Sequence, residues 1–181
     1  MSANYIAHSL KQKFKILYKG KNNFVAHECI LDFRDLKSKT GLSVNDLAKR
    51  LIDYSFHAPT ISWPVPETLM IEPTESESLA ELDRFCEAML LIGDEISEIE
   101  NNIELNNNNV ISNAPHTLKE LIADNWNYPY SKEKASFPYK TLTNIKFWSS
   151  VSRINNAYGD RNLICSCNVN QGETLEEKKC A

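Results

Sequence analysis

The chain contains no apolar run of the length that a membrane-spanning helix requires. Its first residues also lack the long apolar core and small-residue cleavage site of a secretory signal. Basic residues are nowhere interleaved with aromatic residues in the manner of a nucleic-acid-binding surface. We therefore expect no membrane contact, no secretion and no nucleic-acid partner.

A regular cysteine framework is also missing, because the count is odd and the spacing is irregular: Cys29, Cys86, Cys165, Cys167 and Cys180. Disulfide-rich secreted domains carry even, patterned sets of cysteines. The spacing fits no zinc finger and the four histidines are scattered, so we predict no metal site. Cys29 and Cys86 fall on apolar faces and are predicted core residues. This cysteine usage predicts that the protein resides in a reducing compartment. We expect the cytoplasm, with an organelle matrix as the alternative.

Acidic and basic residues are unevenly distributed over the 181 residues. Residues 1–50 hold ten Lys and Arg against four Asp and Glu, whereas residues 67–104 hold twelve acids and one arginine. Such runs usually mark solvated helix faces, which we prefer here over separate charged partners. The length fits one domain with a sizeable core.

The hydrophobic pattern predicts helices and strands in alternation. Each of three helices begins with a capping box, in which a hydroxyl residue is followed three positions later by an acid. The predicted elements are a short helix containing Tyr5, Ile6, Leu10 and Phe14 and ended by Gly20, a strand over 24–33, a helix beginning after Ser43, a strand from Thr68 to Glu72, a long helix from Leu79 to Ile99, and a short helix from Thr117 to Ala123.

The strand over 24–33 has two different faces. Alternation gives the strand two sets of side chains, one on each face. The first set is Val25, His27, Cys29, Leu31 and Phe33, and the second set is Ala26, Glu28, Ile30, Asp32 and Arg34. The mixed second face suggests a cleft or a partner. Two strands alone make a marginal sheet, so we expect a third, from residues 14–18 or from the C-terminal tail. The predicted class is α+β, with a short, mostly antiparallel sheet covered by helices on one face.

Periodicity fails after the short helix, although residues 126–158 hold eight of the seventeen aromatic residues. We predict that this irregular segment wraps over a larger body, which need not be this chain. The predicted organisation is therefore a small α+β domain over 1–104, a C-terminal extension over 105–167 and a disordered tail over 168–181.

The connector between the second predicted helix and the long helix is the most informative part of the sequence. Pro59, Pro64, Pro66 and Pro73 restrict its backbone over residues 54–78. A stiffened connector holds its polar groups in fixed positions. Loops of this kind often carry binding residues. The candidate site residues in this connector are His57, Thr60, Glu72, Thr74 and Glu75.

Long motifs in this connector and around it resemble the C-terminal region of the glycine dehydrogenase (decarboxylating) family, the P-proteins of the glycine cleavage system. The resemblance covers nearly the whole chain. It is carried by AHECILDFR (26–34), DLAKRLIDY (46–54), FHAPT (56–60), SWPVP (62–66), LMIEPTESES (69–78), ELDRFCEAM (81–89), NAPHT (113–117), PYSKEKASFP (129–138) and YGDRNL (158–163).

The resemblance implies the small domain of a fold-type I pyridoxal-phosphate enzyme. Such an enzyme would decarboxylate glycine and pass the aminomethyl group to the lipoyl arm of H-protein. The family's cofactor lysine follows a Ser-x-His stretch, and none of the lysines here has that context. The implied partners are the remainder of the P-protein, H-protein, glycine and further copies of the full enzyme. Pyridoxal phosphate would be bound mainly outside this chain.

The resemblance also implies roles for single residues. His57 would face the cleft or order its loop, with a buried structural histidine as the alternative. Arg34 would bind a substrate carboxylate, or form an ion pair with Asp32 or Glu28. Glu72 would contact the active site or help to begin the next helix, whereas Glu75 would add negative charge at that helix start. Cys165 and Cys167 are redox candidates, with inert thiols as the alternative.

The chain departs from the family pattern at several points. Ser55 and Glu67 stand where the family has glycine, a residue that supplies positive φ or close approach. Gly93 replaces an arginine and should weaken the long helix by about 1 kcal/mol relative to alanine. Such departures are typical of a relaxed or degenerate copy, so a gene remnant without function is one alternative. A second alternative is a non-enzymatic module that binds or modulates a complete P-protein.

Overall fold

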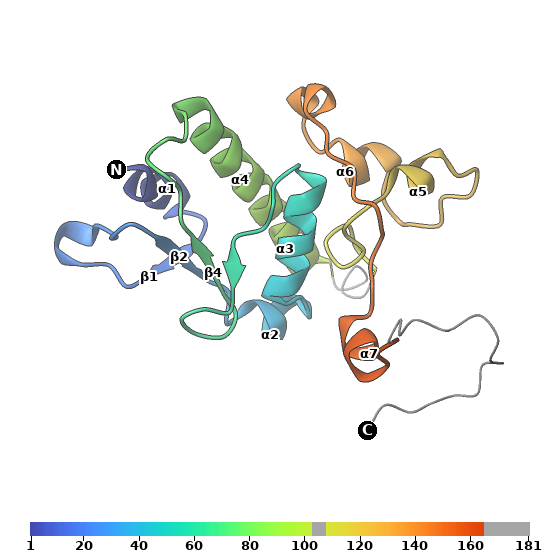
Figure 1. The fold of residues 1–181 in the computed structure, drawn as a ribbon, viewed down its shortest axis with the longest axis horizontal. Helices are drawn as coiled ribbons and strands as arrows, with labels where there is room; N and C mark the ends of the chain where they lie inside the picture. The colour runs from blue at the N-terminus through green and yellow to red at the C-terminus, as the bar shows by residue number, and fades with distance from the viewer. Residues whose placement is uncertain (103–107, 165–181) are drawn as a thin grey trace, which may run out of the picture.

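The structure is a computed structural model that describes residues 1–102 and 108–164 (Figure 1). Its elements are α1 (Ser2–Leu10), β1 (Lys15–Leu17), η1 (Lys21–Asn23), β2 (Cys29–Asp32), α2 (Leu36–Thr40), α3 (Val44–Asp53), β3 (Thr60–Ile61), β4 (Thr68–Ile71), α4 (Leu79–Asn101), α5 (Leu118–Ile122), α6 (Lys132–Ser136), η3 (Lys140–Asn144) and α7 (Asn156–Arg161). Among the described residues, no helix combines the length and apolarity that crossing a membrane requires.

A four-stranded antiparallel sheet in the order β1-β2-β4-β3 lies at the centre of the N-terminal part. The central pair runs from Cys29 opposite Ile71 to Asp32 opposite Thr68. The predicted α+β class and antiparallel sheet are confirmed. The third strand comes from residues 14–18, one of the two sources expected, and β3 adds a fourth from within the connector.

The helices α1, α3 and α4 pack on one face of this sheet (Figure 1). The register places Ile16, Leu31 and Leu69 side by side on that face. These side chains belong to one core with apolar residues of the three helices. Cys29 and Cys86 are buried in the same core as predicted, and burial raises the pKa of the Cys29 thiol to about 12. Burial also raises the pKa of the Cys86 thiol, so we expect both thiols to react slowly.

Helix starts were the best predicted local features. At α3 both the backbone N–H and the hydroxyl of Ser43 donate to the Asp46 carboxylate, at 2.7 and 2.8 Å. Thr117 and Glu120 form the corresponding box at α5. The box at α4 is only half formed: Ser78 Oγ accepts from the backbone N–H of Glu81, while the Glu81 carboxylate binds Arg84.

Several element bounds were wrong. The first helix ends at Leu10, so Phe14 lies outside it and packs edge to face on Phe33. The predicted strand over 24–33 shortens to Cys29–Asp32 because strand pairing begins only where β4 lies alongside. The short helices α6, η3 and α7 were not predicted, because five or six residues give too little periodicity to recognise.

Gly93 lies where the long helix meets the residues that follow α1. A Cβ built on this residue would lie 2.7 Å from Cε of Lys13, so glycine makes room for the lysine side chain. The Lys13 ammonium donates to Asp94 at 2.7 Å and to Ser97 Oγ at 3.1 Å. Gly93 thus allows a close contact between the turn that follows α1 and helix α4.

The irregular segment after residue 108 packs on the other side of α3 and α4 (Figure 1). Tyr139 stacks on Tyr54 at the end of α3, with ring centroids 5.9 Å apart. Val110 and Ile111 belong to the main core. The described part of the extension therefore covers this chain, although Phe147 and Tyr158 remain exposed. The division at residue 104 and the tail over 168–181 stay predictions, since residues 103–107 and 165–181 lie outside the described part.

Positive φ occurs at both positions where the resemblance implies glycine. Ser55 has φ 62° and Glu67 has φ 56°. Each side chain also makes a bond that glycine could not make. Ser55 Oγ accepts from the N–H of Phe147 at 2.8 Å, and Glu67 Oε2 accepts from the N–H of Val44, the first residue of α3, at 2.9 Å. At these two positions a strained backbone is coupled to a tertiary contact.

This coupling predicts an inverted order of stability at position 67. Glu67→Ala loses the bond to α3 but keeps the left-handed strain, whereas Glu67→Gly loses the bond and relieves the strain. We expect the glycine variant to be more stable than the alanine variant by about 1 kcal/mol, the reverse of the order within a regular helix. Urea unfolding of both variants measures the difference. An alanine variant equal to or more stable than the glycine variant would contradict the assignment of strain.

Candidate functional site

The sheet face opposite the helices gathers several predicted site residues. Thr60 lies opposite Met70, which in turn lies opposite Ile30. Ile30 and Met70 are buried but lie outside the main core. Polar side chains surround this small apolar centre on the same face. The mixed face predicted from residues 24–33 is therefore present over Ile30 and Asp32, and it extends onto β4 and β3.

Arg34 lies at one end of this face and binds Asp32. Its Nε and Nη2 atoms donate to the two Asp32 oxygens at 2.8 and 2.7 Å, and Lys15 adds a second cation at 3.0 Å. The hydrogen bonds from Arg34 hold the pKa of Asp32 well below its usual range, against the effect of its burial. The structure thus has the ion pair that the sequence left as the alternative to carboxylate binding. The guanidinium is half exposed, so an added anion can approach it. To bind that anion, Arg34 would have to share its hydrogen bonds between the anion and Asp32, or release Asp32.

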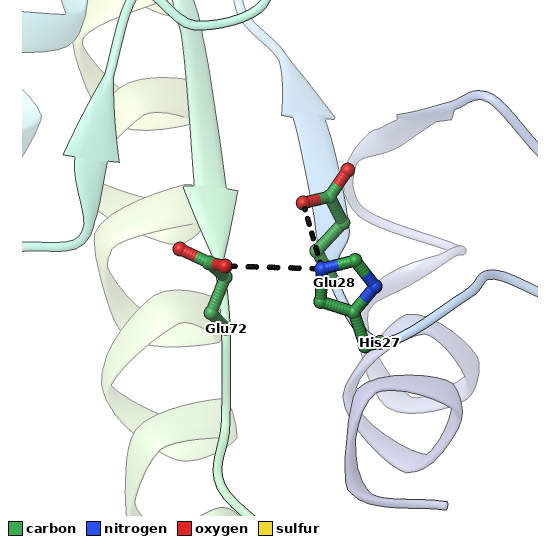
Figure 2. A group of neighbouring side chains, drawn as sticks. All are labelled: His27, Glu28 and Glu72. Carbon is green, nitrogen blue, oxygen red and sulfur yellow. Dashed lines mark ion pairs between the residues drawn. The ribbon is translucent and has the colours of Figure 1, made fainter.

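His27, Glu28 and Glu72 converge at the other end of the face (Figure 2). His27 and Glu28 directly precede β2, and Glu72 directly follows the antiparallel strand β4. His27 Nε2 lies 3.7 Å from a Glu28 oxygen and 4.0 Å from a Glu72 oxygen. The sequence identified Glu72 as a site residue and named Glu28 only as a possible partner of Arg34. It placed His27 on the opposite strand face, so it did not predict that the three residues meet.

The remaining connector candidates are exposed. His57 is exposed, so the alternative of a buried structural histidine was wrong for this residue. Thr74 contacts Ser76 Oγ at 2.9 Å, and Glu75 lies exposed three residues before the N-cap of α4. The structure does not bring these three residues together with Arg34. Cys165 and Cys167 lie outside the described residues.

A buried ionic network, missed by the sequence analysis, joins α3, α4 and the extension. Arg50 is fully buried, and its Nε and Nη2 atoms donate to Glu95 at 3.0 and 2.6 Å. Nη1 donates to Asp53 at 2.9 Å, and further bonds reach the carbonyls of Lys134 and Ala135. Burial opposes its charge, but the two carboxylates outweigh burial and raise the pKa of Arg50.

His116 completes this network from the extension. Its Nδ1 atom and backbone N–H each lie 2.8 Å from an oxygen of Asp53, and Nε2 lies 2.9 Å from the hydroxyl of Tyr130. The ring is surrounded by Trp126, Tyr128 and Tyr130. His116 is therefore the buried structural histidine of the described chain, and its bonds hold the extension against α3. Two features of the sequence could have indicated this network. One is the histidine in the NAPHT motif, and the other is the presence of charged residues within the apolar stripe of α3.

Lys146 is a partly buried group at this junction. Its ammonium donates to the carbonyl of Asp53 and lies 5.1 Å from the ring centroid of Trp148. Burial lowers the pKa of Lys146 to about 8. Its contacts fix the extension to the end of α3.

These observations define a small α+β domain with one helix-covered sheet face, one mixed face and a C-terminal extension fixed by buried charges. The family model described as "Glycine dehydrogenase, C-terminal domain" matches residues 1–116. The chain therefore belongs to the glycine dehydrogenase C-terminal domain family. The resemblance drawn from its motifs is confirmed.

Curated relatives extend this likeness beyond residue 116. A glycine dehydrogenase (decarboxylating) of Thermosynechococcus vestitus is 57% identical over 169 residues, which cover 93% of this chain and 18% of the relative. A protein of the same name from Prochlorococcus marinus (strain NATL1A) is 59% identical over 167 residues, 92% of this chain and 17% of the relative. The mitochondrial protein of that name from Dictyostelium discoideum is 56% identical over the same shares. The chain thus spans less than a fifth of these relatives.

Proposed function

We propose that this chain acts as the small C-terminal domain of a glycine dehydrogenase (decarboxylating) of fold-type I. The complete enzyme would decarboxylate glycine with pyridoxal phosphate and transfer the aminomethyl group to the lipoyl arm of H-protein. The observation that carries this proposal is identity of 56–59% to proteins of that name over at least 92% of the chain. The likeness covers the extension as well as the domain.

The mixed sheet face is the surface we assign to the cofactor-bearing remainder of the enzyme. Arg34, Thr60 and Glu72 lie on this face or at its ends, where they could meet a cleft between two domains. Loops next to the strands also expose Phe24 and Trp63, each more than 60% accessible. Large exposed aromatic side chains beside a mixed surface favour a contact with another protein body.

Pyridoxal phosphate does not fit the described residues taken alone. The buried carboxylate of Asp53 is bound to Arg50 and His116, so it is not available to a pyridine nitrogen. Lys146, the lysine whose pKa is lowered, points its ammonium at a backbone carbonyl. We therefore assign the cofactor to the remainder of the enzyme and derive no chemical step within this chain.

The proposed setting follows the family. The complete enzyme would form a homo-oligomer and work with H-protein in the cytoplasm or an organelle matrix. His57, Thr74 and Glu75 would lie at the entrance of the cleft, since all three are exposed on the connector between α3 and α4. Any redox role of Cys165 and Cys167 would belong to this assembly.

Complementation tests the proposal. The Thermosynechococcus vestitus relative, ended before the region that this chain matches, should show little glycine–CO₂ exchange by itself. Adding this chain should restore exchange, because it supplies the missing domain. Activity no higher than that of the truncated relative alone would contradict the proposal. A chain carrying Arg50→Met, which breaks the buried network, is the matched negative control.

The same assay separates the alternative of a modulating module. If this chain supplies the missing domain, the truncated relative needs it for turnover. Adding it to the complete relative then leaves the exchange rate unchanged. A modulator has the opposite signature, since it alters the rate of the complete relative and does not rescue the truncated one. The second pattern would replace the proposed function with a regulatory one.

A further inference from the structure

His27, Glu28 and Glu72 are spaced as ligands around a common centre. One atom from each side chain lies within 4.8 Å of the other two. The imidazole nitrogen is 3.7 and 4.0 Å from the two carboxylates, which is longer than a direct hydrogen bond. Figure 2 shows the three groups turned toward one another from the ends of two adjacent strands.

The register supplies a second reason to expect a cation here. Cys29 lies opposite Ile71, so Glu28 and Glu72 lie one step further along the same antiparallel pair. Like charges placed opposite each other on adjacent strands are destabilising. Lys15 and Arg34 lie on the same sheet face, but both are paired with Asp32 at the opposite end of β2. A bound divalent cation would offset the repulsion between the two carboxylates.

The dimensions suit zinc. Zinc binds histidine nitrogen and carboxylate oxygen at roughly 2.1 Å, which places tetrahedral ligands about 3.4 Å apart. The separations of 3.7 and 4.0 Å would close by about 0.3 and 0.6 Å, and the two carboxylate oxygens, which lie within 4.8 Å of each other, by up to about 1.4 Å. The side chains of His27 and Glu72 are 79% and 50% exposed, so changes of side-chain rotamer can bring the ligand atoms together. Solvent would fill the fourth position.

We infer that His27, Glu28 and Glu72 form a binding site for a divalent cation of the zinc type, with three protein ligands and one open position. The inference is independent of the proposed function, since it rests on the sheet register and side chains of this chain. The site is exposed at the end of the mixed sheet face, where the cation could also meet a ligand from a docked body.

Zinc titration of the full chain tests this site. Thiolates compete for zinc, so the titrations use a background carrying Cys165→Ser, Cys167→Ser and Cys180→Ser. After removal of metal with a chelator, calorimetry should show one equivalent of zinc bound per chain. His27→Gln and Glu72→Gln should each weaken binding by at least about tenfold, because each removes a direct ligand.

Matched controls change the same residue types outside the cluster. His57→Gln and Glu75→Gln should leave the zinc affinity unchanged, since both residues are exposed elsewhere on the connector. Cobalt gives a second readout, because its visible spectrum reports the ligand field and should be lost in His27→Gln. Absence of stoichiometric binding, or equal zinc affinity in His27→Gln and His57→Gln, would overturn the inference.

Discussion

An Arg50→Met variant should lose roughly 3–5 kcal/mol of its free energy of unfolding. Methionine fills a similar volume but leaves Glu95 and Asp53 buried without their shared cation. The carbonyls of Lys134 and Ala135 also lose a donor. Since small proteins have total stabilities of about 5–15 kcal/mol, such a loss would move the urea midpoint far toward zero.

Two further variants separate the buried network from the general effect of removing an arginine. Arg34→Met removes a half-exposed guanidinium from a nearly buried Asp32 carboxylate, which keeps its contact with Lys15, so its midpoint should fall less than that of Arg50→Met. Arg50→Met combined with Glu95→Leu removes both charges of the shortest buried pair and should recover part of the loss. An Arg50→Met midpoint close to that of Arg34→Met would contradict the assignment of Arg50 as the central contact.

A chimera should retain enzymatic activity when this chain replaces the matching part of the Thermosynechococcus vestitus relative. Identity of 57% over 169 residues means that the replaced body and its contact surface are expected to have the same backbone. We expect glycine–CO₂ exchange within about tenfold of the parent, equivalent to a loss of no more than about 1.4 kcal/mol in the transition state.

The Arg50→Met form of the chimera provides its control. This substitution changes no residue on the mixed sheet face, so any loss of activity would come from loss of the domain's structure. We expect that form to lose both exchange and cooperative unfolding of the C-terminal part. Equal activity in the two chimeras would show that the buried network is not needed to hold the domain in its working form.

The local elements could be predicted where a short stretch of sequence determines them. The capping pairs at Ser43 and Thr117 and the strand over Thr68–Ile71 depend on neighbours within a few residues. The strand β3 could not be found this way. Its two residues pair only because the connector folds back beside β4.

The functional surfaces divide in the same way. Arg34 and Glu72 were found because they terminate recognisable strands. The cluster of His27 with Glu28 and Glu72, and the buried pairing of Arg50 with Glu95, depend on register and on contacts across 45 residues of sequence. The only sign of the Arg50–Glu95 pairing in the sequence was a charged residue inside an apolar helical stripe. The general inference is that such a charge predicts a buried partner but not which one.

The exchange rate of the chimera tests the central claim most directly, because it joins this chain to the remainder of a relative named glycine dehydrogenase (decarboxylating). Pyridoxal phosphate bound to the purified chimera is first verified by its visible absorbance. We expect glycine–CO₂ exchange close to the parent rate, and far above that of the relative ended before the matched region. A soluble chimera that binds the cofactor but exchanges no faster than the truncated relative would contradict the assignment of this chain as a working glycine dehydrogenase domain.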